Sequence, residues 1–117
     1  LKNLRKEYKN LVRNIWNPFD KTNEKILGCT TVNRLYITPL GDVLVCPYVH
    51  IKIGNILKQN LKDIVEKGFS IKYFRNHSDL CLAGEDKNFI NNFMTKQGQS
   101  IFNPANADEI FSSSDKI

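Results

Sequence analysis

Residues 28–56 read GCTTVNRLYITPLGDVLVCPYVHIKIGNI, and this stretch decides how the chain folds. It holds two short segments rich in β-branched and aromatic residues, RLYIT (34–38) and DVLVC (42–46), separated by Pro39-Leu40-Gly41. Proline presets the backbone at the start of a tight turn, and glycine accepts the positive φ that the turn requires. The stretch therefore predicts an antiparallel β-hairpin.

Three cysteines occur in the 117 residues, and the predicted hairpin brings two of them together. Cys29 precedes the first hairpin strand and Cys46 ends the second, so their thiols should lie close although sixteen residues separate them. Cys81 precedes a predicted helix, whose N-terminus would favour a thiolate. An odd number of cysteines excludes a complete set of intramolecular disulfides, and metal binding or redox chemistry is the cytosolic alternative.

Hydrophobic periodicity predicts three helices beside the hairpin. Residues 2–16 form an amphipathic pattern that ends before Pro18, and residues 61–67 follow Asn60, whose side chain should cap the amide of Asp63. Gly68 is the expected stop of this second helix.

The third helix should run from near Cys81 or Ala83 to Thr95, burying Phe89, Ile90 and Phe93. Residues 69–80 should be irregular. The fold class predicted is α+β, with an N-terminal helix, a small antiparallel hairpin and two following helices around a metal cluster.

Composition and charge exclude several classes of protein. The formal net charge is +5, with seven Lys/Arg against three Asp/Glu in residues 1–28, seven against four in 29–81, and three against five in 82–117. This spread lacks the basic stripe of a nucleic-acid-binding protein. No apolar run approaches the length of a membrane span. No signal-peptide pattern opens the chain, and its first residue is Leu1; we expect a cytoplasmic fragment or processed product.

The cysteine stretch resembles the SPASM and twitch domains that follow the barrel of many radical-SAM enzymes. Those domains share a cysteine, about nine to fifteen residues, a glycine, four residues and a second cysteine. Here eleven residues separate Cys29 from Gly41, and four separate Gly41 from Cys46. The family's Pro-x-Gly-(Asp/Glu)-Val appears as residues 39–43, and its Gly-Asn-Ile before a capped helix appears as residues 54–56.

The resemblance implies that Cys29, Cys46 and Cys81 bind one auxiliary [4Fe–4S] cluster that serves substrate binding or electron transfer. The full SPASM pattern continues with further cysteines for a second auxiliary cluster, so this chain resembles the shorter, single-cluster version. The CxxxCxxC motif of the SAM-cleaving cluster is absent from these residues. By the resemblance they are not catalytic alone, and SAM with its own cluster belongs to the parent radical-SAM enzyme.

The resemblance also divides the chain into three regions. Residues 1–27 would be an amphipathic helix and linker that connect to the radical-SAM barrel of the same parent chain. Residues 28–97 would be the cluster-binding domain, and residues 98–117 a loosely ordered tail. The partners that the resemblance implies are this barrel and a small-molecule or peptide substrate. The absence of a long apolar run argues against a membrane partner, and the spread of charge argues against nucleic acid.

Three thiolates leave one iron of a [4Fe–4S] cluster without a cysteine. His50, four residues after Cys46, and His77, four residues before Cys81, are the candidates to complete the ligand set, with Asp79 as a weaker one. An open iron that binds substrate is the other possibility. Zinc is the alternative metal, because three cysteines and one histidine form a normal structural zinc site. The chain would then be a stand-alone zinc-stabilised binding module.

Other side chains near the cysteines are weaker candidates. Aromatic residues could shield a cluster from water, and basic residues could steer an anionic substrate, although core packing and solvated charge explain them as well. They are Tyr36, Tyr48 and Phe74 for shielding, and Arg34, Lys52 and Arg75 for steering.

Overall fold

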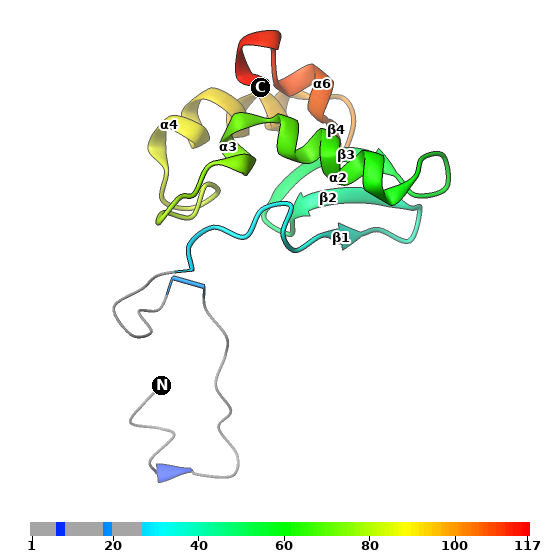
Figure 1. The fold of residues 1–117 in the computed structure, drawn as a ribbon. Helices are drawn as coiled ribbons and strands as arrows, with labels where there is room; N and C mark the ends of the chain where they lie inside the picture. The colour runs from blue at the N-terminus through cyan, green and yellow to red at the C-terminus, as the bar shows by residue number, and fades with distance from the viewer. Residues whose placement is uncertain (1–6, 9–17, 20–26) are drawn as a thin grey trace.

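The structure is a computed structural model that describes residues 7–8, 18–19 and 27–117. The helix expected over residues 2–16 lies outside the described residues except for its positions 7 and 8. Three strands come first, a run of helices follows, and one short strand lies between the last helices, which confirms the α+β class (Figure 1). Within the described part no helix is long and apolar enough to cross a membrane.

The described elements follow one another in this order: β1 (Tyr36–Ile37), β2 (Asp42–Cys46), β3 (Val49–Asn55), α2 (Leu61–Ser70), α3 (Lys72–Arg75), α4 (Lys87–Phe89), the π-helix η1 (Ile90–Met94), α5 (Thr95–Gln99), β4 (Ala105–Asn106), α6 (Ala107–Ile110) and the 3₁₀ helix η2 (Ser113–Asp115).

The predicted hairpin is present as β1 and β2. The strands are antiparallel, with Tyr36 opposite Leu44, and Gly41 has the expected positive φ of 84° in the turn. The amide of Gly41 donates to the carbonyl of Thr38 at 2.9 Å, which closes the turn. The turn residues therefore formed the hairpin that the sequence predicts, although its first strand is limited to Tyr36–Ile37.

The sheet is larger than the hairpin, because β3 and β4 extend it in the order β1-β2-β3-β4. Strand β3 pairs antiparallel with β2 and parallel with β4. In β3, Val49, Ile51 and Ile53 are fully buried, while His50 between them is exposed. This alternation with a period of two is what a strand with one buried face requires.

Helix α2 lies against the sheet and is longer than predicted (Figure 1). Asn60 caps it by accepting from the amide of Lys62 at 2.8 Å, whereas the amide of Asp63 was expected to be the donor. Gly68 lies inside the helix and does not stop it. A Cβ at Gly68 would stand 2.9 Å from side-chain atoms of Ile53 and Val32, so the glycine lets the helix approach the sheet closely. Helix α3 then occupies part of the stretch expected to be irregular.

The third predicted helix begins later than expected and is built from α4, η1 and α5. Asp86 is its N-cap and accepts from the amide of Phe89 at 3.0 Å. Phe89 and Phe93 are buried as predicted, whereas Ile90 is only half-buried. An aromatic cluster forms around them, with neighbouring ring centroids between 4.7 and 6.3 Å apart. Its members are Tyr73, Phe74, Phe89, Phe93 and Phe111.

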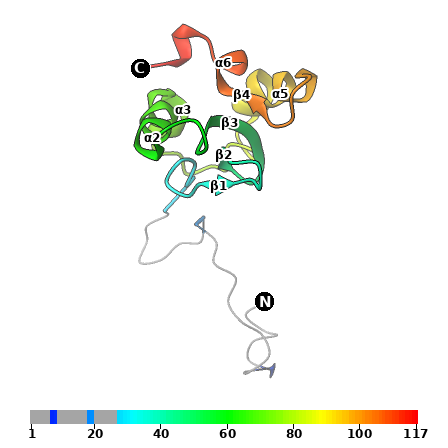
Figure 2. The ribbon, with the colours of Figure 1, turned by 90° about the vertical axis from the view of Figure 1, so that its right-hand side faces the viewer.

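The sequence predicts a loosely ordered tail over residues 98–117, but in the structure the chain from Ala105 onward packs against the rest of the domain. Ala105, Ile110 and Phe111 are at most 3% exposed. Figures 1 and 2 show this segment, orange to red, folded back onto the domain on the side of α3. The amide of Ile117 donates to the carbonyl of Ser70 at 2.8 Å. Scattered apolar residues in a polar stretch gave no periodicity, so only the tertiary contacts reveal their burial.

Asp115 ties this segment to the core. Its carboxylate accepts from the amide of Ser112 at 2.9 Å, from the Ser112 hydroxyl at 2.8 Å and from the hydroxyl of Tyr73 at 3.0 Å. Burial alone would raise the pKa of the Asp115 carboxyl, but the hydrogen bonds from Ser112 and Tyr73 together outweigh it and hold the pKa below its ordinary value. The charged form of Asp115 therefore stabilises the folded state.

We expect Asp115→Asn to lower the free energy of unfolding at pH 7 by about 1–3 kcal/mol, because the amide replaces a charged acceptor of three hydrogen bonds. A carboxyl with a lowered pKa stabilises the fold above its ordinary pKa of about 3.9, and this contribution disappears as the pH falls through the lowered value. The difference between variant and parent should therefore shrink below about pH 4. Urea unfolding followed by circular dichroism measures it.

Asp63→Asn is the matched control, because Asp63 is exposed on α2 and its substitution removes the same negative charge. It should stay within about 0.5 kcal/mol of the parent. Equal stability of the Asp115 and Asp63 variants at pH 7 would show that the carboxylate does not hold the C-terminal segment.

Candidate metal centre

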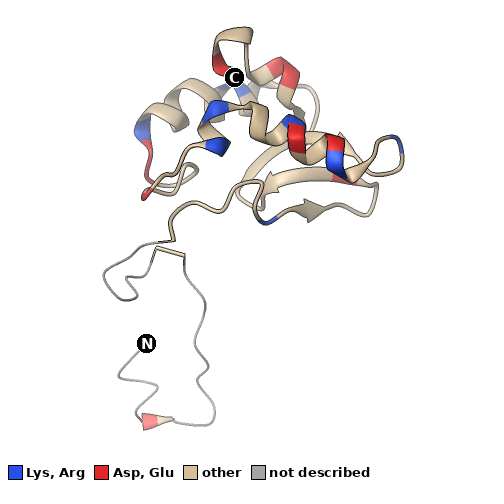
Figure 3. Cartoon of the chain, in the orientation of Figure 1, with Lys and Arg blue, Asp and Glu red and all other residues tan. Residues whose placement is uncertain are grey.

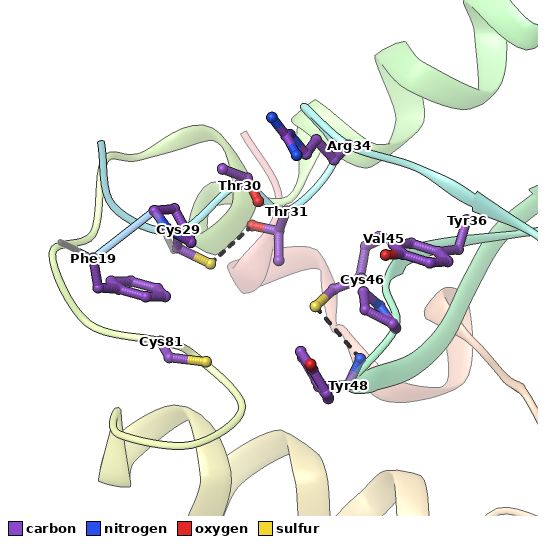
Figure 4. A pocket seen from close by; sticks show the side chains of 12 residues that line it. Phe19, Cys29, Thr30, Thr31, Arg34, Tyr36, Val45, Cys46, Tyr48 and Cys81 are labelled. Atoms are coloured by element: carbon purple, nitrogen blue, oxygen red, sulfur yellow. Dashed lines mark hydrogen bonds between the residues drawn. The ribbon is translucent and has the colours of Figure 1, made fainter. Parts of the chain in front are cut away.

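Cys29, Cys46 and Cys81 line one cavity of about 440 Å³, as the sequence indicated. Cys29 lies in the segment that leads to β1, Cys46 ends β2, and Cys81 lies in the turn region before α4. All three thiols are free and half-buried. Figure 4 shows their sulfur atoms pointing into the same space from three sides. The fold thus gathers every cysteine of the chain at one place.

Backbone contacts on both sides hold Cys29 in position. Its amide donates to the carbonyl of Ser78 at 2.8 Å, and the preceding Gly28 has a φ of 80°. A Cβ at Gly28 would collide with the Ser78 carbonyl oxygen and stand 2.8 Å from Cε1 of His77. Only glycine therefore allows this close approach without strain.

Val32 fastens the same segment to the end of β2. Its amide donates to the carbonyl of Val45 at 3.1 Å, next to Cys46. Val32 is 3% exposed and has a φ of 65°, a left-handed conformation that a β-branched residue rarely adopts. Such a conformation costs about 1–3 kcal/mol and persists only where its surroundings fix it. The loop that positions Cys29 is therefore held rigidly.

The electrostatics of Cys46 reflect the two neighbouring thiols. Burial raises the pKa of the Cys46 thiol, and the amides of Tyr48 and Val49 lower it in part. The negative charges of Cys29 and Cys81 in their thiolate forms raise this pKa further. Three thiolates in one cavity repel one another, so a positively charged metal centre would offset both the burial and the repulsion.

Cys81 is held by a turn and not by the start of a helix, which corrects the sequence-based expectation. Its amide donates to the carboxylate of Glu85 at 2.8 Å, and its carbonyl accepts from the amides of Glu85 at 2.8 Å and Asp86 at 3.0 Å. The helix begins only at Lys87, so its dipole does not act on Cys81 directly. The turn and the hydrogen bond to the Glu85 carboxylate therefore hold the backbone of Cys81 in place.

The structure places neither histidine in the three-cysteine cavity. His50 is exposed, and its Nε2 lies 3.0 Å from the carbonyl oxygen of Pro47. His77 Nε2 lies 2.7 Å from Oδ1 of Asp79, and both side chains are mostly exposed. His77 lines a neighbouring groove that also reaches Cys29. Both histidines are therefore exposed and have polar partners of their own, and neither lies beside the three thiols in the cavity.

Some of the weaker candidates line the cavity and others do not. Tyr36, Tyr48 and Arg34 line it, whereas Phe74 is 3% exposed in the aromatic core. Lys52 and Arg75 lie outside it. Several residues of the site were not predicted from the sequence, among them Phe19 and Thr30 in the lining, Thr31, whose Oγ1 lies 3.6 Å from Cys29 Sγ, and Glu85. The Thr30-Thr31 pair directly after Cys29 was the available signal, because hydroxyls commonly bond to metal-bound sulfur.

The donor set of the cavity suits a metal centre built on sulfur ligands. Thiolates are the soft ligands that iron–sulfur clusters and zinc prefer. Among the described residues no three His, Cys, Asp or Glu side chains come close enough to hold a single metal ion. Three soft thiolates around a cavity of about 440 Å³ therefore fit an iron–sulfur cluster.

Comparison with known proteins gives a family match. The family model SPASM, described as an iron–sulfur cluster-binding domain, matches residues 29–87, which include all three cysteines and about half of the chain. No curated protein matches this sequence. No solved structure matches it either.

We expect Gly28→Ala to weaken iron binding, because the added Cβ would push Cys29 away from the Ser78 carbonyl. Loss of iron to an excess of chelator should be about tenfold faster than in the parent, the scale seen when residues that position metal ligands are changed. Iron release followed by absorption in anaerobic buffer measures this rate.

Gly98→Ala serves as the control, because a Cβ at Gly98 meets no atom within 4 Å and this residue lies in α5. This variant should keep its iron as the parent does and be equally or slightly more stable. Identical rates in the two glycine variants would contradict the proposed role of Gly28.

Proposed function

Since the chain belongs to the SPASM family of iron–sulfur cluster-binding domains, we propose that its three cysteines bind one auxiliary [4Fe–4S] cluster that serves a radical-SAM enzyme. The observation that supports this most directly is the convergence of Cys29, Cys46 and Cys81 on one cavity. When bound, such a cluster supplies an iron that accepts an electron or binds a polar atom of a substrate.

The residues around the cavity have separate tasks in this proposal. The three thiolates would hold the cluster, and the Thr31 hydroxyl and the Tyr48 amide would bond to the sulfurs of Cys29 and Cys46. Hydrogen bonds to ligating sulfurs and the degree of solvent access tune the potential of a cluster. Tyr48 is 72% exposed and Tyr36 50% exposed, so these rings stand where a ligand or a partner surface would meet the cavity.

The wider setting of this domain belongs to the same proposal. The CxxxCxxC motif that binds the SAM-cleaving cluster does not occur in these 117 residues. In this proposal, SAM would be cleaved at the cluster of a radical-SAM barrel. The partners are then that barrel, as part of the same parent chain, and a small-molecule or peptide substrate. Three free thiols and an oxygen-sensitive cluster fit the reducing cytoplasm.

We favour substrate binding over electron transfer as the task of the cluster. The chain has three cysteines, and neither of its histidines lines the cavity. A [4Fe–4S] cluster bound here would therefore have one iron for which this cavity offers no cysteine or histidine. An iron of this kind is suited to bind an oxygen or nitrogen atom of a substrate.

Protein prepared without oxygen should contain about four iron and four acid-labile sulfide per chain, with a broad absorption band near 400 nm. Cys29→Ser, Cys46→Ser and Cys81→Ser should each lower the iron content to about half or less, because a serine hydroxyl is a poor ligand for this cluster. Metal and sulfide analysis with absorption spectra measures these contents.

One tightly bound zinc without sulfide, even after anaerobic reconstitution with iron and sulfide, would replace the cluster proposal with a zinc-stabilised module. Full iron content in all three serine variants would show that the ligands lie elsewhere. The spectrum should persist at the parent intensity in Thr95→Ala, a control at an exposed position outside the cavity.

His50→Ala and His77→Ala should keep the iron content and the electron paramagnetic resonance spectrum of the reduced cluster, because neither ring lines the cavity. Cyanide, a small ligand for an open iron, should change that spectrum in the parent and in both variants. A histidine variant with an altered spectrum before cyanide is added would identify that histidine as the fourth ligand, and an unresponsive parent would favour electron transfer.

A further inference from the structure

Strand β1 is an exposed outer strand of the sheet. It stands at one end of the order β1-β2-β3-β4 and pairs with β2 alone (Figures 1 and 2). At the other end of this order, Ala105 of β4 is 1% exposed and the chain turns directly into α6. On β1, by contrast, Tyr36 and Ile37 are each 50% exposed. Of the two outer strands, β1 is therefore the accessible one.

The register of the hairpin leaves two backbone groups of β1 unpaired. The amide of Thr38 donates to the carbonyl of Asp42 at 2.9 Å, so these two residues form a hydrogen-bonded pair. Hydrogen-bonded and non-hydrogen-bonded pairs alternate along an antiparallel ladder, which makes Ile37 and Val43 a non-hydrogen-bonded pair. The amide and carbonyl of Ile37 therefore point away from β2. In the described part of the chain they make no hydrogen bond.

The free edge of β1 carries no charge that would keep another strand away. Charged side chains and proline on an edge strand are common protection against added strands. β1 consists of Tyr36 and Ile37 (tan in Figure 3). An uncharged edge with a free donor and a free acceptor is complementary to the backbone of an extended peptide. The strand has two residues, so few hydrogen bonds form and a bound peptide would dissociate readily.

This edge lies beside the three-cysteine cavity. Tyr36 lines the cavity together with Cys46, the last residue of β2. Figure 4 shows the Tyr36 ring on the Cys46 side of the cavity. Side chains alternate between the two faces of a strand, so every second side chain of a strand added to β1 would stand on the same face as Tyr36. These side chains would lie next to the cavity.

We propose that the free edge of β1 binds an extended peptide segment of the substrate as a further strand of the sheet, beside the cluster. The inference rests on the proposed function, because it selects a peptide from the two substrate classes named there. The amide and carbonyl of Ile37 exchange hydrogen bonds with the peptide backbone, which makes this attachment independent of the peptide's sequence. The exposed rings of Tyr36 and Tyr48, which both line the cavity, then select the side chain that enters it.

The test is the fluorescence anisotropy of a dye-labelled peptide of about seven alternating threonine and valine residues, titrated with the cluster-loaded protein. Ile37→Pro should weaken binding at least about tenfold, because proline lacks the outward N–H and its ring occupies the place of the donor. The variant should fold, since proline is tolerated on an edge strand where its missing N–H would face solvent. Circular dichroism and iron content check the fold.

Ile37→Ala is the matched control, because it removes the same side chain and keeps the backbone N–H. Its affinity should stay within about threefold of the parent, since main-chain hydrogen bonds supply most of the affinity in strand addition. A peptide methylated on its central amide nitrogens lacks the donors and should bind the parent at least about tenfold more weakly. Equal affinities of the proline and alanine variants, or equal binding of both peptides, would overturn the proposal.

A second copy of this chain is the other occupant that could pair with the free edge. Sedimentation of the parent without peptide should show a monomer. A dimer that Ile37→Pro converts into a monomer would assign the edge to self-association and overturn its assignment to a peptide.

Two further measurements separate this inference from the cluster proposal. Beside a reduced, paramagnetic cluster, the nuclear magnetic resonance signals of the peptide should broaden in the parent and stay sharp with Ile37→Pro. Normal iron content without peptide binding would overturn the strand site and leave the cluster proposal standing. Peptide binding to protein that holds no iron after anaerobic reconstitution would overturn the cluster proposal instead.

Discussion

The cost of placing three thiolates in one half-buried cavity is the constraint that a metal centre in this domain has to meet. Burial raises the pKa of Cys46, and the charges of Cys29 and Cys81 in their thiolate forms raise it further, so the metal-free cavity favours the protonated Cys46 thiol, and a metal centre must displace its proton. Backbone contacts nevertheless hold the cysteines around one cavity. The loop of Cys29 is bonded to the end of β2 through Val32 and to the carbonyl of Ser78. A metal centre then converts an unfavourable arrangement into a binding site.

The core beneath the site explains how so small a domain holds this arrangement. Strand β3 buries alternate residues and packs against α2, while β2 buries three successive residues. The aromatic cluster joins α3, α4 and η1 to the residue that follows α6. Gly68 lets α2 lie close to Val32, the residue with the left-handed backbone. The strain of the Cys29 loop is thus offset by the close packing of α2 against Val32.

The sequence predicted the features that depend on neighbouring residues. It did not predict the features that depend on contacts between distant parts of the chain. The hairpin, the capping residue Asn60 and the gathering of the cysteines followed from turn chemistry and strand pairing. Strand β4 has only two residues, and its pairing with β3 depends on the chain folding back, so no window of sequence contains it. The placement of His50 and His77 outside the cavity likewise depends on loops whose course periodicity does not specify.

The C-terminal segment completes the sheet and the core, and it is the last part of the domain to be synthesised. The residues that match the family end at 87, yet the sheet takes its last strand from Ala105–Asn106 and the core takes Phe111. During synthesis the three cysteines therefore leave the ribosome before the core that supports them is complete. The packing that supports the three-cysteine cavity is therefore finished only when the C-terminal segment has emerged and joined the sheet.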